Sequence, residues 1–406
     1  MEQYIGKIVR LNRKQEKLKQ EYICVKTGIA RSQLSRYERN KEKISTDNIK
    51  NIFQVMNIEV YPHDENTFEK DFLSFYEDIA YENDFQNSYR RILSYYPQIR
   101  ATTSYIKYLL ACMIYNIHTQ LVNDIKEYFY MTDYFEYLEP YQQQLYYDYL
   151  GIFLFQRERY IESLEYYNKA DFYTGNHVSL SMLYYHKSII YTILGKYSEA
   201  RLSINVAIEQ FIETVNMKRI LMSKFHYANI QSNSGHFDEA IFIYKKCIPA
   251  FDNMNMSNYV KSTYNNLLWV YIQDEKYKEV IMTYFQKMDQ DTHNHKIYFY
   301  LSYAYYQLNE KEKAIHYIEL AKYYMNQASE YMENMINSFS IFLSNATFDK
   351  KEAYLLKVYH ICEKRHENYL IIFIIKFLIQ FYKEHHCIQQ TYTFQNQLIK
   401  YYEEIS

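Results

Sequence analysis

The sequence predicts an all-α protein, with a small basic domain at its N-terminus and a long body of helical pairs. Three observations carry this prediction. The 406 residues include only 6 Gly and 4 Pro, so few positions would break a helix. The charge is uneven along the chain, and one turn pattern recurs at nearly regular intervals. The scarcity of glycine also argues against enzymes that hold a phosphate in a glycine-rich loop.

Basic residues are concentrated at the N-terminus. Residues 1–50 contain 13 Lys and Arg against six Asp and Glu, a net charge of +7, whereas the rest of the chain contains 33 against 42, a net charge of −9. A basic segment on an acidic body is typical of a phosphate-binding module attached to a domain that does not bind nucleic acid.

The chain lacks the signals of a membrane or secreted protein. The longest apolar run covers residues 370–375, and only a few more apolar residues follow after Lys376. A bilayer-spanning helix needs about 20 apolar residues. No apolar signal region is present at the N-terminus, and the five cysteines are scattered without a Cys-x-x-Cys pair. We therefore expect a cytoplasmic protein with reduced thiols and no membrane partner.

Residues 4–58 read as four or five short helices joined by narrow turns. The second helix, residues 20–26, is expected to bring Tyr22, Ile23 and Val25 to a core. Gly28 follows it, where a helix-turn-helix needs a residue that tolerates positive φ.

The next predicted helix covers residues 30–38. Leu34 and Tyr37 lie three positions apart and face the core, which leaves the polar side chains on other faces. Asn40 can end this helix in the left-handed conformation, and Ser45 can cap the helix that follows.

Residues 27–41, which read TGIARSQLSRYERNK, resemble the helix-turn-helix of the phage-repressor (XRE) superfamily. They are similar in particular to the Rgg/MutR-like regulators, whose recognition segment commonly reads Ser-Gln-Ile-Ser-Arg-Phe-Glu-Arg-Gly. This sequence departs from the pattern at Asn12, where Leu is usual and where core packing is expected to shift to Leu11. It departs also at Lys17, where Gly is frequent, and at Asn40, where Gly is usual.

The resemblance implies roles for individual residues of this domain. Gln20 matches the glutamine that fixes the domain on a DNA phosphate. Arg31, Ser32 and Arg36 match outward positions of the recognition helix, where an arginine can read guanine, and Gln33 is a weaker candidate. The alternative is that Arg36 and Arg39 merely pair with Glu38 or Glu42 on a solvated surface.

The body contains a recurring turn signature of the form small-or-polar, any, aromatic, any, any, small. It appears at residues 158–163, 195–200, 235–240, 275–280 and 309–314, with spacings of 37, 40, 40 and 34 residues. The period resembles that of tetratricopeptide (TPR) repeats, which implies a right-handed TPR-like α-solenoid.

Two columns of mostly small residues test this register. The last signature position is Ser163, Ala200, Ala240, Val280 or Ala314, and twelve residues before it stand Gly151, Ser188, Ala228, Leu268 and Ser302. Seven residues after it stand Ala170, Ala207, Cys247, Lys287 and Ala321, so four of the five residues are small in each of these two columns. The sequence thus divides into a helix-turn-helix domain (1–65), a linker with divergent helical pairs (66–140), TPR-like repeats (141–325) and divergent C-terminal helical repeats or a cap (326–406).

The TPR resemblance implies a concave groove lined by the first helix of each repeat. Its candidate peptide-binding residues are Tyr185, Phe225, Asn229, Asn265, Trp269, Phe299 and Tyr303. Asparagine can pair both its donor and its acceptor with a peptide bond, and aromatic pockets can bind side chains. The alternative is that these aromatic residues fill space against the neighbouring repeat.

No cluster of residues predicts catalysis, a cofactor or a metal. The densest groups of metal-ligand types are His385, His386 and Cys387, and His360, Cys362 and His366. Neither group has a full set of ligands at the i,i+3 or i,i+4 spacing that a helical metal site requires. We therefore expect a protein that is not an enzyme.

A basic helix-turn-helix domain joined to a TPR-like body resembles the cytoplasmic peptide-pheromone receptors that include Rgg, PlcR and PrgX. The resemblance implies a homodimeric transcription regulator that binds double-stranded DNA and is switched by a short signalling peptide. Two alternatives remain open. One is a TPR protein that inhibits a partner protein or a phosphorelay component, and the other is a lysogeny-type repressor without a peptide ligand.

Overall fold

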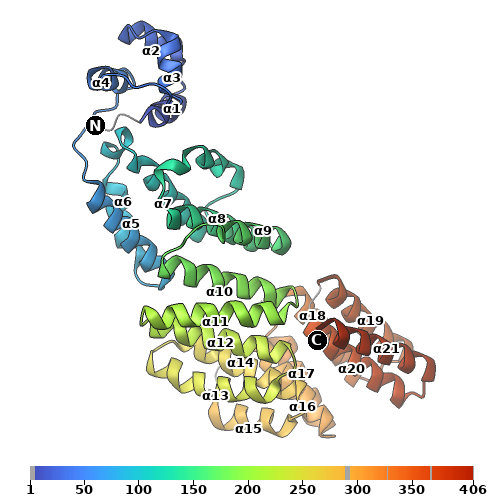
Figure 1. The fold of residues 1–406 in the computed structure, drawn as a ribbon. Helices are drawn as coiled ribbons and strands as arrows, with labels where there is room; N and C mark the ends of the chain where they lie inside the picture. Colours follow the sequence, from blue (N-terminus) through green and yellow to red (C-terminus); the bar gives the residue numbers. More distant parts are fainter. Residues whose placement is uncertain (1–4, 289–292, 327, 366–367, 406) are drawn as a thin grey trace. The chain divides into compact units, whose positions relative to one another are not determined.

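The computed structural model describes residues 5–288, 293–326, 328–365 and 368–405, and every regular element in them is a helix (Figure 1). The predicted all-α class, a helix-turn-helix domain followed by TPR-like pairs, is confirmed. The chain forms two compact units, residues 1–186 and 187–406, with the division inside α10 (His177–Ile193). None of the helices described is long and apolar enough to cross a bilayer.

The first unit begins with a four-helix head. Its helices are α1 (Gly6–Gln15), α2 (Gln20–Thr27), α3 (Arg31–Tyr37) and α4 (Thr46–Val55). Ile23 and Leu34 are fully buried, as predicted, but Tyr22 and Val25 are 46% and 82% exposed. The prediction for these two residues was wrong because α2 has only two turns, and only the face that carries Ile23 meets the other helices.

The turns of the head have the predicted backbone conformations. Gly28 has a φ of 73° and Asn40 a φ of 56°, both in the left-handed region, and the Ser45 side chain accepts a hydrogen bond from the backbone N–H of Asn48. Gly6 is required by a close approach, since a Cβ atom there would lie 1.8 Å from the carbonyl oxygen of Tyr37.

The rest of the first unit consists of α-helices with two 3-10 segments between them. These elements are α5 (Glu65–Ala80), α6 (Phe85–Ser94), η1 (Gln98–Ala101), α7 (Ser104–His118), η2 (Ile125–Tyr137), α8 (Pro140–Phe155) and α9 (Tyr160–Ala170).

The head is held on the rest of the first unit by a buried polar contact. The Asn12 side chain is fully buried, and its Nδ2 donates to the carbonyl oxygen of Arg100 at 2.9 Å. The Arg100 guanidinium donates from Nε to Asn12 Oδ1 at 3.0 Å and from Nη2 to Glu16 Oε1 at 2.6 Å. Leu11 is buried beside it, as expected, but Asn12 itself stays inside because Arg100 satisfies its amide group.

A second polar contact holds the head at η2. The ammonium of Lys7 lies 2.6 Å from Glu136 Oε2, and Asn40 Nδ2 donates to Glu136 Oε1 and to the hydroxyl of Tyr137, each at 2.7 Å. We call the contacts of Asn12, Glu16, Lys7 and Asn40 with the rest of the unit the head joint.

Replacing Asn12 with Leu is expected to loosen the head joint. The leucine would leave the carbonyl oxygen and Nε of Arg100 without partners, which costs about 1–3 kcal/mol in a buried site. We expect faster amide hydrogen exchange in α1 and η1, whereas Gln54→Leu, an exposed position on α4, should leave the exchange unchanged. Equal protection in Asn12→Leu and the unmodified chain would show that the joint does not fix the head.

The second unit continues as antiparallel helical pairs (Figure 1). Its helices after α10 are α11 (Tyr197–Glu213), α12 (Met217–Asn233), α13 (Phe237–Asn253), α14 (Ser257–Gln273), α15 (Tyr277–Lys287), α16 (His295–Gln307), α17 (Lys311–Tyr323), α18 (Glu330–Leu343), α19 (Phe348–Arg365), α20 (Asn368–Glu384) and α21 (Ile388–Ile405).

The repeat register taken from the sequence agrees with the structure. The first signature positions all have left-handed backbone: Glu158 (58°), Gly195 (72°), Gly235 (81°), Glu275 (58°) and Asn309 (64°). The column twelve residues before the last signature position is buried throughout, and the column seven residues after it is buried except at the exposed Lys287. In two repeats a serine hydroxyl joins the last signature position and the position twelve before it, from Ser163 to the carbonyl of Gly151 at 2.8 Å and from Ser302 to that of Ala314 at 2.6 Å.

The C-terminal helices pack against the first helices of the last two repeats. The Phe373 ring on α20 lies 5.1 Å from the ring of Trp269 on α14 and 5.0 Å from that of Tyr303 on α16. Phe339 on α18 contacts Phe299 and Tyr303 at 5.7 and 5.6 Å. An extensive aromatic core therefore fills the space in front of α14 and α16.

The stability of the second unit is expected to fall in mild acid because of His226. Burial lowers the pKa of His226 to about 4, and a hydrogen bond with the backbone of Ser188 only partly opposes this effect. The unfolded chain, whose histidine has a pKa near 6.5, therefore binds the proton more readily, and stability is lost as the pH falls from about 6.5 toward 4. The full loss is about 3 kcal/mol, from the difference of the two pKa values.

Chemical denaturation at pH 7, 6 and 5 checks this prediction. His226→Gln should flatten the pH dependence of the denaturation midpoint between pH 6.5 and 5, and the exposed control His316→Gln should not change it. The same slope in His226→Gln and in the unmodified chain would contradict the prediction.

Candidate functional site

The recognition helix α3 presents two arginines to solvent. Arg31 is 68% exposed and pairs with Glu21 at 2.8 Å, and Arg36 is 52% exposed and pairs with Glu42 at 2.5 Å. The alternative stated from the sequence, a pairing of Arg36 with Glu42, is therefore present. Exposed ion pairs of this kind are worth only about 0–1 kcal/mol, so either arginine can exchange its carboxylate for a phosphate or a base. Ser32 is exposed and Gln33 is half-buried on the same helix.

A buried ionic network locks the helices of the head together. The carboxylate of Glu38, only 2% exposed, accepts from Arg13 Nε at 2.6 Å and from Arg13 Nη2 at 2.8 Å. Gln20 Nε2 donates to the same carboxylate at 2.8 Å. One N–H of the Gln20 side-chain amide is thus bonded within the head, and the other can donate to an acceptor on a ligand.

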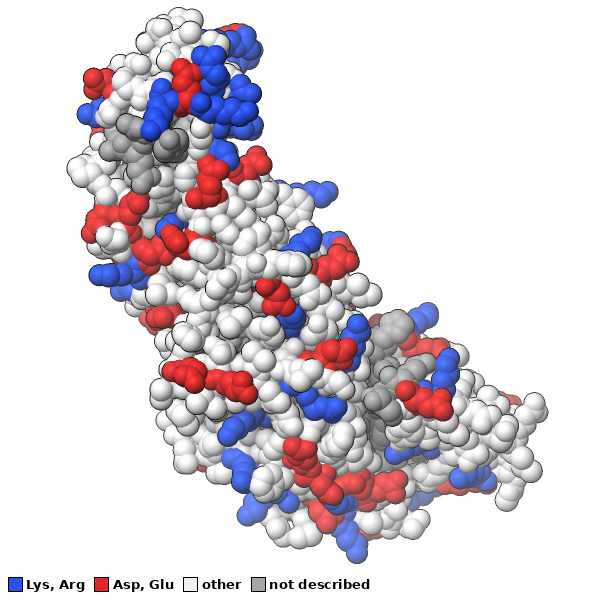
Figure 2. All heavy atoms as spheres, in the orientation of Figure 1, with Lys and Arg blue, Asp and Glu red and all other residues white. Residues whose placement is uncertain are grey.

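Basic side chains surround a shallow cavity beside this network. The cavity has a volume of about 530 Å³ and is lined by Arg10, Arg13, Lys14, Lys19, Gln20, Glu21, Arg31, Ser35, Glu38 and Arg39. Figure 2 shows Lys and Arg side chains gathered on the head. The structure brings the predicted residues Gln20 and Arg31 together here, whereas Ser32, Gln33 and Arg36 do not line the cavity. Arg10, Lys14 and Lys19 were not singled out from the sequence, because each is one of many basic residues there.

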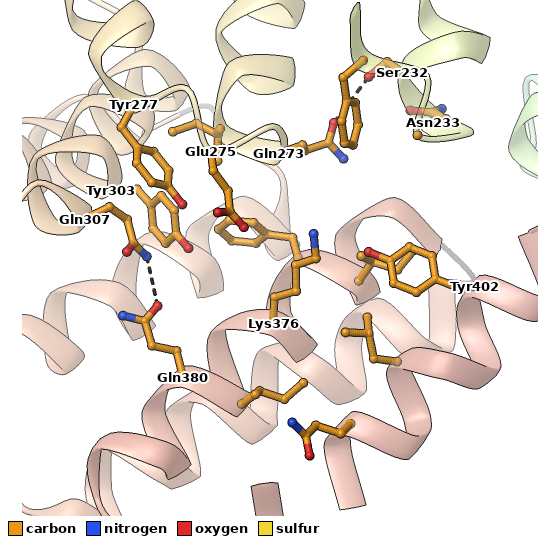
Figure 3. A pocket seen from close by; sticks show the side chains of 18 of the residues that line it. Ser232, Asn233, Gln273, Glu275, Tyr277, Tyr303, Gln307, Lys376, Gln380 and Tyr402 are labelled. Atoms are coloured by element: carbon orange, nitrogen blue, oxygen red, sulfur yellow. Dashed lines mark hydrogen bonds between the residues drawn. The ribbon is translucent and has the colours of Figure 1, made fainter. Parts of the chain in front are cut away.

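A second, larger cavity of about 620 Å³ lies within the second unit (Figure 3). One wall consists of the C-terminal ends of α12 and α14, the turns that follow them and the C-terminal half of α16, and the other wall consists of α20 and α21. Its polar lining is rich in amides and hydroxyls: Ser232, Asn233, Ser234, Gln273, Tyr277, Tyr303, Gln307, Gln380, Gln395 and Tyr402. Its charged residues are Glu275, Lys376, Lys383 and Glu384. We call this space the amide cavity.

Hydrogen bonds link the two walls of the amide cavity and leave several polar groups available. Gln307 Nε2 donates to Gln380 Oε1 at 3.1 Å, and Gln380 Nε2 donates to Glu384 at 3.0 Å. Burial, followed by the negative charge of Glu275, raises the pKa of Tyr277 to about 12. Burial also raises the pKa of Tyr303 far above its ordinary value. Both phenols are therefore neutral at physiological pH and can donate as well as accept.

The residues predicted to bind peptide are placed in different surroundings. Tyr185 belongs to the first unit and the other six to the second. Phe225 packs against Tyr244, Phe251 and Tyr259, as the space-filling alternative predicted. Asn229 Oδ1 accepts from Tyr244 and from Asn266 Nδ2, and Asn265 contacts Asn266 in turn.

The other three predicted residues, Trp269, Phe299 and Tyr303, are covered by side chains of α18 and α20. Phe299 is 2% exposed and Tyr303 is 6% exposed, while Trp269 is half-buried against Phe373. The register predicted these positions as exposed, and they are covered because the C-terminal helices supply Phe339 and Phe373. Of the seven residues only Tyr303 lines the amide cavity, and a contact of any of them with a peptide stays a prediction.

Sequence reasoning missed the part of the amide cavity that α20 and α21 contribute. Lys376, Gln380 and Lys383 recur at positions i, i+4 and i+7, which places them on one face of α20. This spacing is visible in the sequence, but residues 326–406 carry no repeat signature that would have placed the face against α14 and α16.

No group of three or more His, Cys, Asp or Glu that could hold a metal is found in the described part of the chain. His366 of the weaker candidate cluster lies outside the described residues.

Comparison with known proteins gives a domain family for the head and a fold for most of the chain. The helix-turn-helix family model matches residues 9–61. No curated protein gives a significant match to the sequence. A Rap protein complexed with Competence and Sporulation Factor has a TM-score of 0.64 at 12% identity, covering 84% of this chain and 99% of that one.

The quorum sensor NprR from B. thuringiensis, in its apo form, has a TM-score of 0.59 at 16% identity, covering 83% of this chain and 99% of that one. NprR in complex with its cognate peptide NprX has a TM-score of 0.56 at 16% identity, covering 82% of this chain and 99% of that one.

The head and the body together define a helix-turn-helix protein with a TPR-like helical body. Its fold is that of the Rap proteins and of NprR, so the predicted resemblance is confirmed at the level of the helix-turn-helix domain and of the fold.

Proposed function

We propose that this protein is a transcription regulator that binds promoter DNA through its head and is switched by a short signalling peptide held in the second unit. The observation that carries the proposal is the basic, exposed recognition helix on a chain whose fold is that of NprR, a quorum sensor that binds a peptide. We propose further that it acts by binding alone, in the cytoplasm, without a cofactor or a membrane partner.

The basic cavity of the head is the proposed binding site for a DNA phosphate. Six of its lining residues are Lys or Arg, and the second N–H of Gln20 is available to a phosphate oxygen. Arg31, Ser32 and Arg36 would then face the major groove, where an arginine can donate to O6 and N7 of guanine. Gln33 would lie at the edge of this contact.

The amide cavity is the proposed binding site for the peptide. Amide side chains from both walls can pair with the N–H and C=O groups of an extended backbone, and the aromatic side chains can hold apolar residues. The cavity volume of about 620 Å³ falls within the range of ordinary ligand sites. Tyr303 is the residue shared by this proposal and the sequence prediction.

The switch is proposed to act on a homodimer. Two heads must meet half-sites one helical turn of DNA or a multiple apart, so a small change in their separation alters affinity. A peptide that binds one arrangement of the body more tightly would shift the population toward it.

A second candidate function is supported by the likeness to Rap proteins and to aspartyl phosphate phosphatase F from Bacillus subtilis. In that case the body would act mainly by binding a partner protein or a phosphorelay component. The helix-turn-helix match at residues 9–61 favours the DNA-binding function. A repressor without a peptide ligand remains the third possibility.

Titration of DNA binding with peptide tests the proposal. Fluorescence anisotropy of the DNA upstream of the gene is measured with peptides encoded by short open reading frames beside it, and with scrambled peptides as control. We expect one peptide to change the DNA affinity at least severalfold. Specific DNA binding that no peptide alters would favour the repressor, and no specific DNA binding would favour the partner-protein function.

A further inference from the structure

The amide cavity is lined by two cations that form no ion pair with a described residue. Lys376 and Lys383 line it from α20, and neither forms an ion pair with any residue described. Lys376 is half-buried and extends from α20 into the cavity, toward the wall that carries Glu275 (Figure 3). A cation that is partly removed from water without a partner favours a ligand that brings an anion.

The spacing of these cations sets the spacing of the anions they would bind. Lys376 and Lys383 are seven residues apart, which is two helical turns, so both lie on one face of α20 at a separation of about 10 Å. In an extended peptide of the polyproline II type, side chains three residues apart share a face and are about 9 Å apart. Adjacent side chains point in different directions and cannot meet both cations.

Gln380 lies between the two lysines and suits the backbone of such a peptide. Its amide already bonds to Gln307 and Glu384, which fixes its orientation and leaves one N–H for a peptide carbonyl. Glu384, next to Lys383, accepts from Gln380 and from the hydroxyl of Tyr306 at 3.4 Å. Its charge opposes an anion at that end, so Lys376 is the stronger of the two sites.

The geometry points to a peptide ligand with two carboxylates three residues apart, one at Lys376 and one at Lys383. Glu275 on the opposite wall forms no ion pair with a described residue and suits a positive group of the same peptide, such as its N-terminal ammonium. The inference rests on the proposed function, because it names the chemistry of the peptide for the same site.

Three pools of hexapeptides with free N-termini and amidated C-termini test it on the full-length protein. The first pool has Asp at positions 2 and 5, the second has Asp at positions 2 and 3, the third has Asn at positions 2 and 5, and all other positions are random. The protein is immobilised, and the bound fraction of each pool is measured by mass spectrometry.

Since each ion pair contributes about threefold, we expect the first pool to bind about tenfold better than the third, which forms no pair, and about threefold better than the second, which forms one. Lys376→Gln should lower this preference about threefold, Lys383→Gln should lower it less because Glu384 weakens that site, and the double variant should abolish it. Lys357→Gln, an exposed lysine on α19 away from the cavity, should leave it unchanged.

Equal binding of the three pools would overturn the inference and leave peptide sensing in place. A preference for the first pool that survives in the double variant would also overturn it, because the carboxylates would then bind elsewhere. If no pool binds at all, peptide sensing by this protein fails together with the inference.

Discussion

Replacing Arg31 and Arg36 together with Ala is expected to abolish specific binding to promoter DNA. Each arginine that donates to a guanine or fixes a phosphate contributes about 1–3 kcal/mol, so the double variant should lose about 30-fold to 10⁴-fold in affinity. Both side chains are more than half exposed and are paired only to exposed or half-exposed carboxylates, so their removal should not unfold the head.

The measurement is DNA binding as a function of salt, on promoter DNA and on a scrambled sequence. Arg90→Ala, an exposed arginine on α6, is the matched control and should bind as the unmodified chain does. An affinity within twofold of the unmodified chain would contradict the proposed recognition surface. If the logarithm of affinity falls less steeply with the logarithm of salt concentration in one of the single variants, that arginine contacts a phosphate rather than a base.

Replacing Glu38 with Ala is expected to unfold the head. The guanidinium of Arg13 is only 12% exposed, and the substitution removes the carboxylate that accepts two hydrogen bonds from it. It also removes the acceptor of the Gln20 side chain. Breaking a buried ion pair from one side costs about 3–5 kcal/mol, which is a large share of the stability of so small a domain.

Hydrogen exchange and limited proteolysis of the full chain measure this effect. We expect α1, α2 and α3 to lose protection in Glu38→Ala, and Glu38→Gln to lose less, because a glutamine oxygen can still accept from Arg13. Glu21→Ala removes an exposed acid from the neighbouring ion pair and should change stability by less than about 1 kcal/mol. Full protection in Glu38→Ala would show that the network does not stabilise the head.

Local signals in the sequence identified most of the helical architecture. Positive φ at Gly28 and Asn40 and at the repeat turns follows from residue types that tolerate the left-handed conformation, so the turns could be located without a structure. The small columns could be found because close helix packing excludes large side chains at those positions.

Contacts between distant segments could not be predicted in the same way. The chain between Asn12 and Arg100 carries no periodic signal that relates them, so the reason for an asparagine where leucine is usual became visible only in the fold. Likewise the C-terminal helices lack the repeat signature, and the burial of Phe299 and the contribution of Lys376 to the amide cavity depend on where these helices pack.

The head joint has a consequence for the entropy of DNA recognition. A head on a free tether would lose orientational freedom each time it met a duplex, and this loss would weaken binding. Because Asn12 and Lys7 fix the head on the first unit, most of that freedom is already lost when the chain folds. If the head binds DNA as proposed, residues such as Arg100 and Glu136 would therefore raise its affinity through pre-organisation, although they lie outside the helix-turn-helix domain.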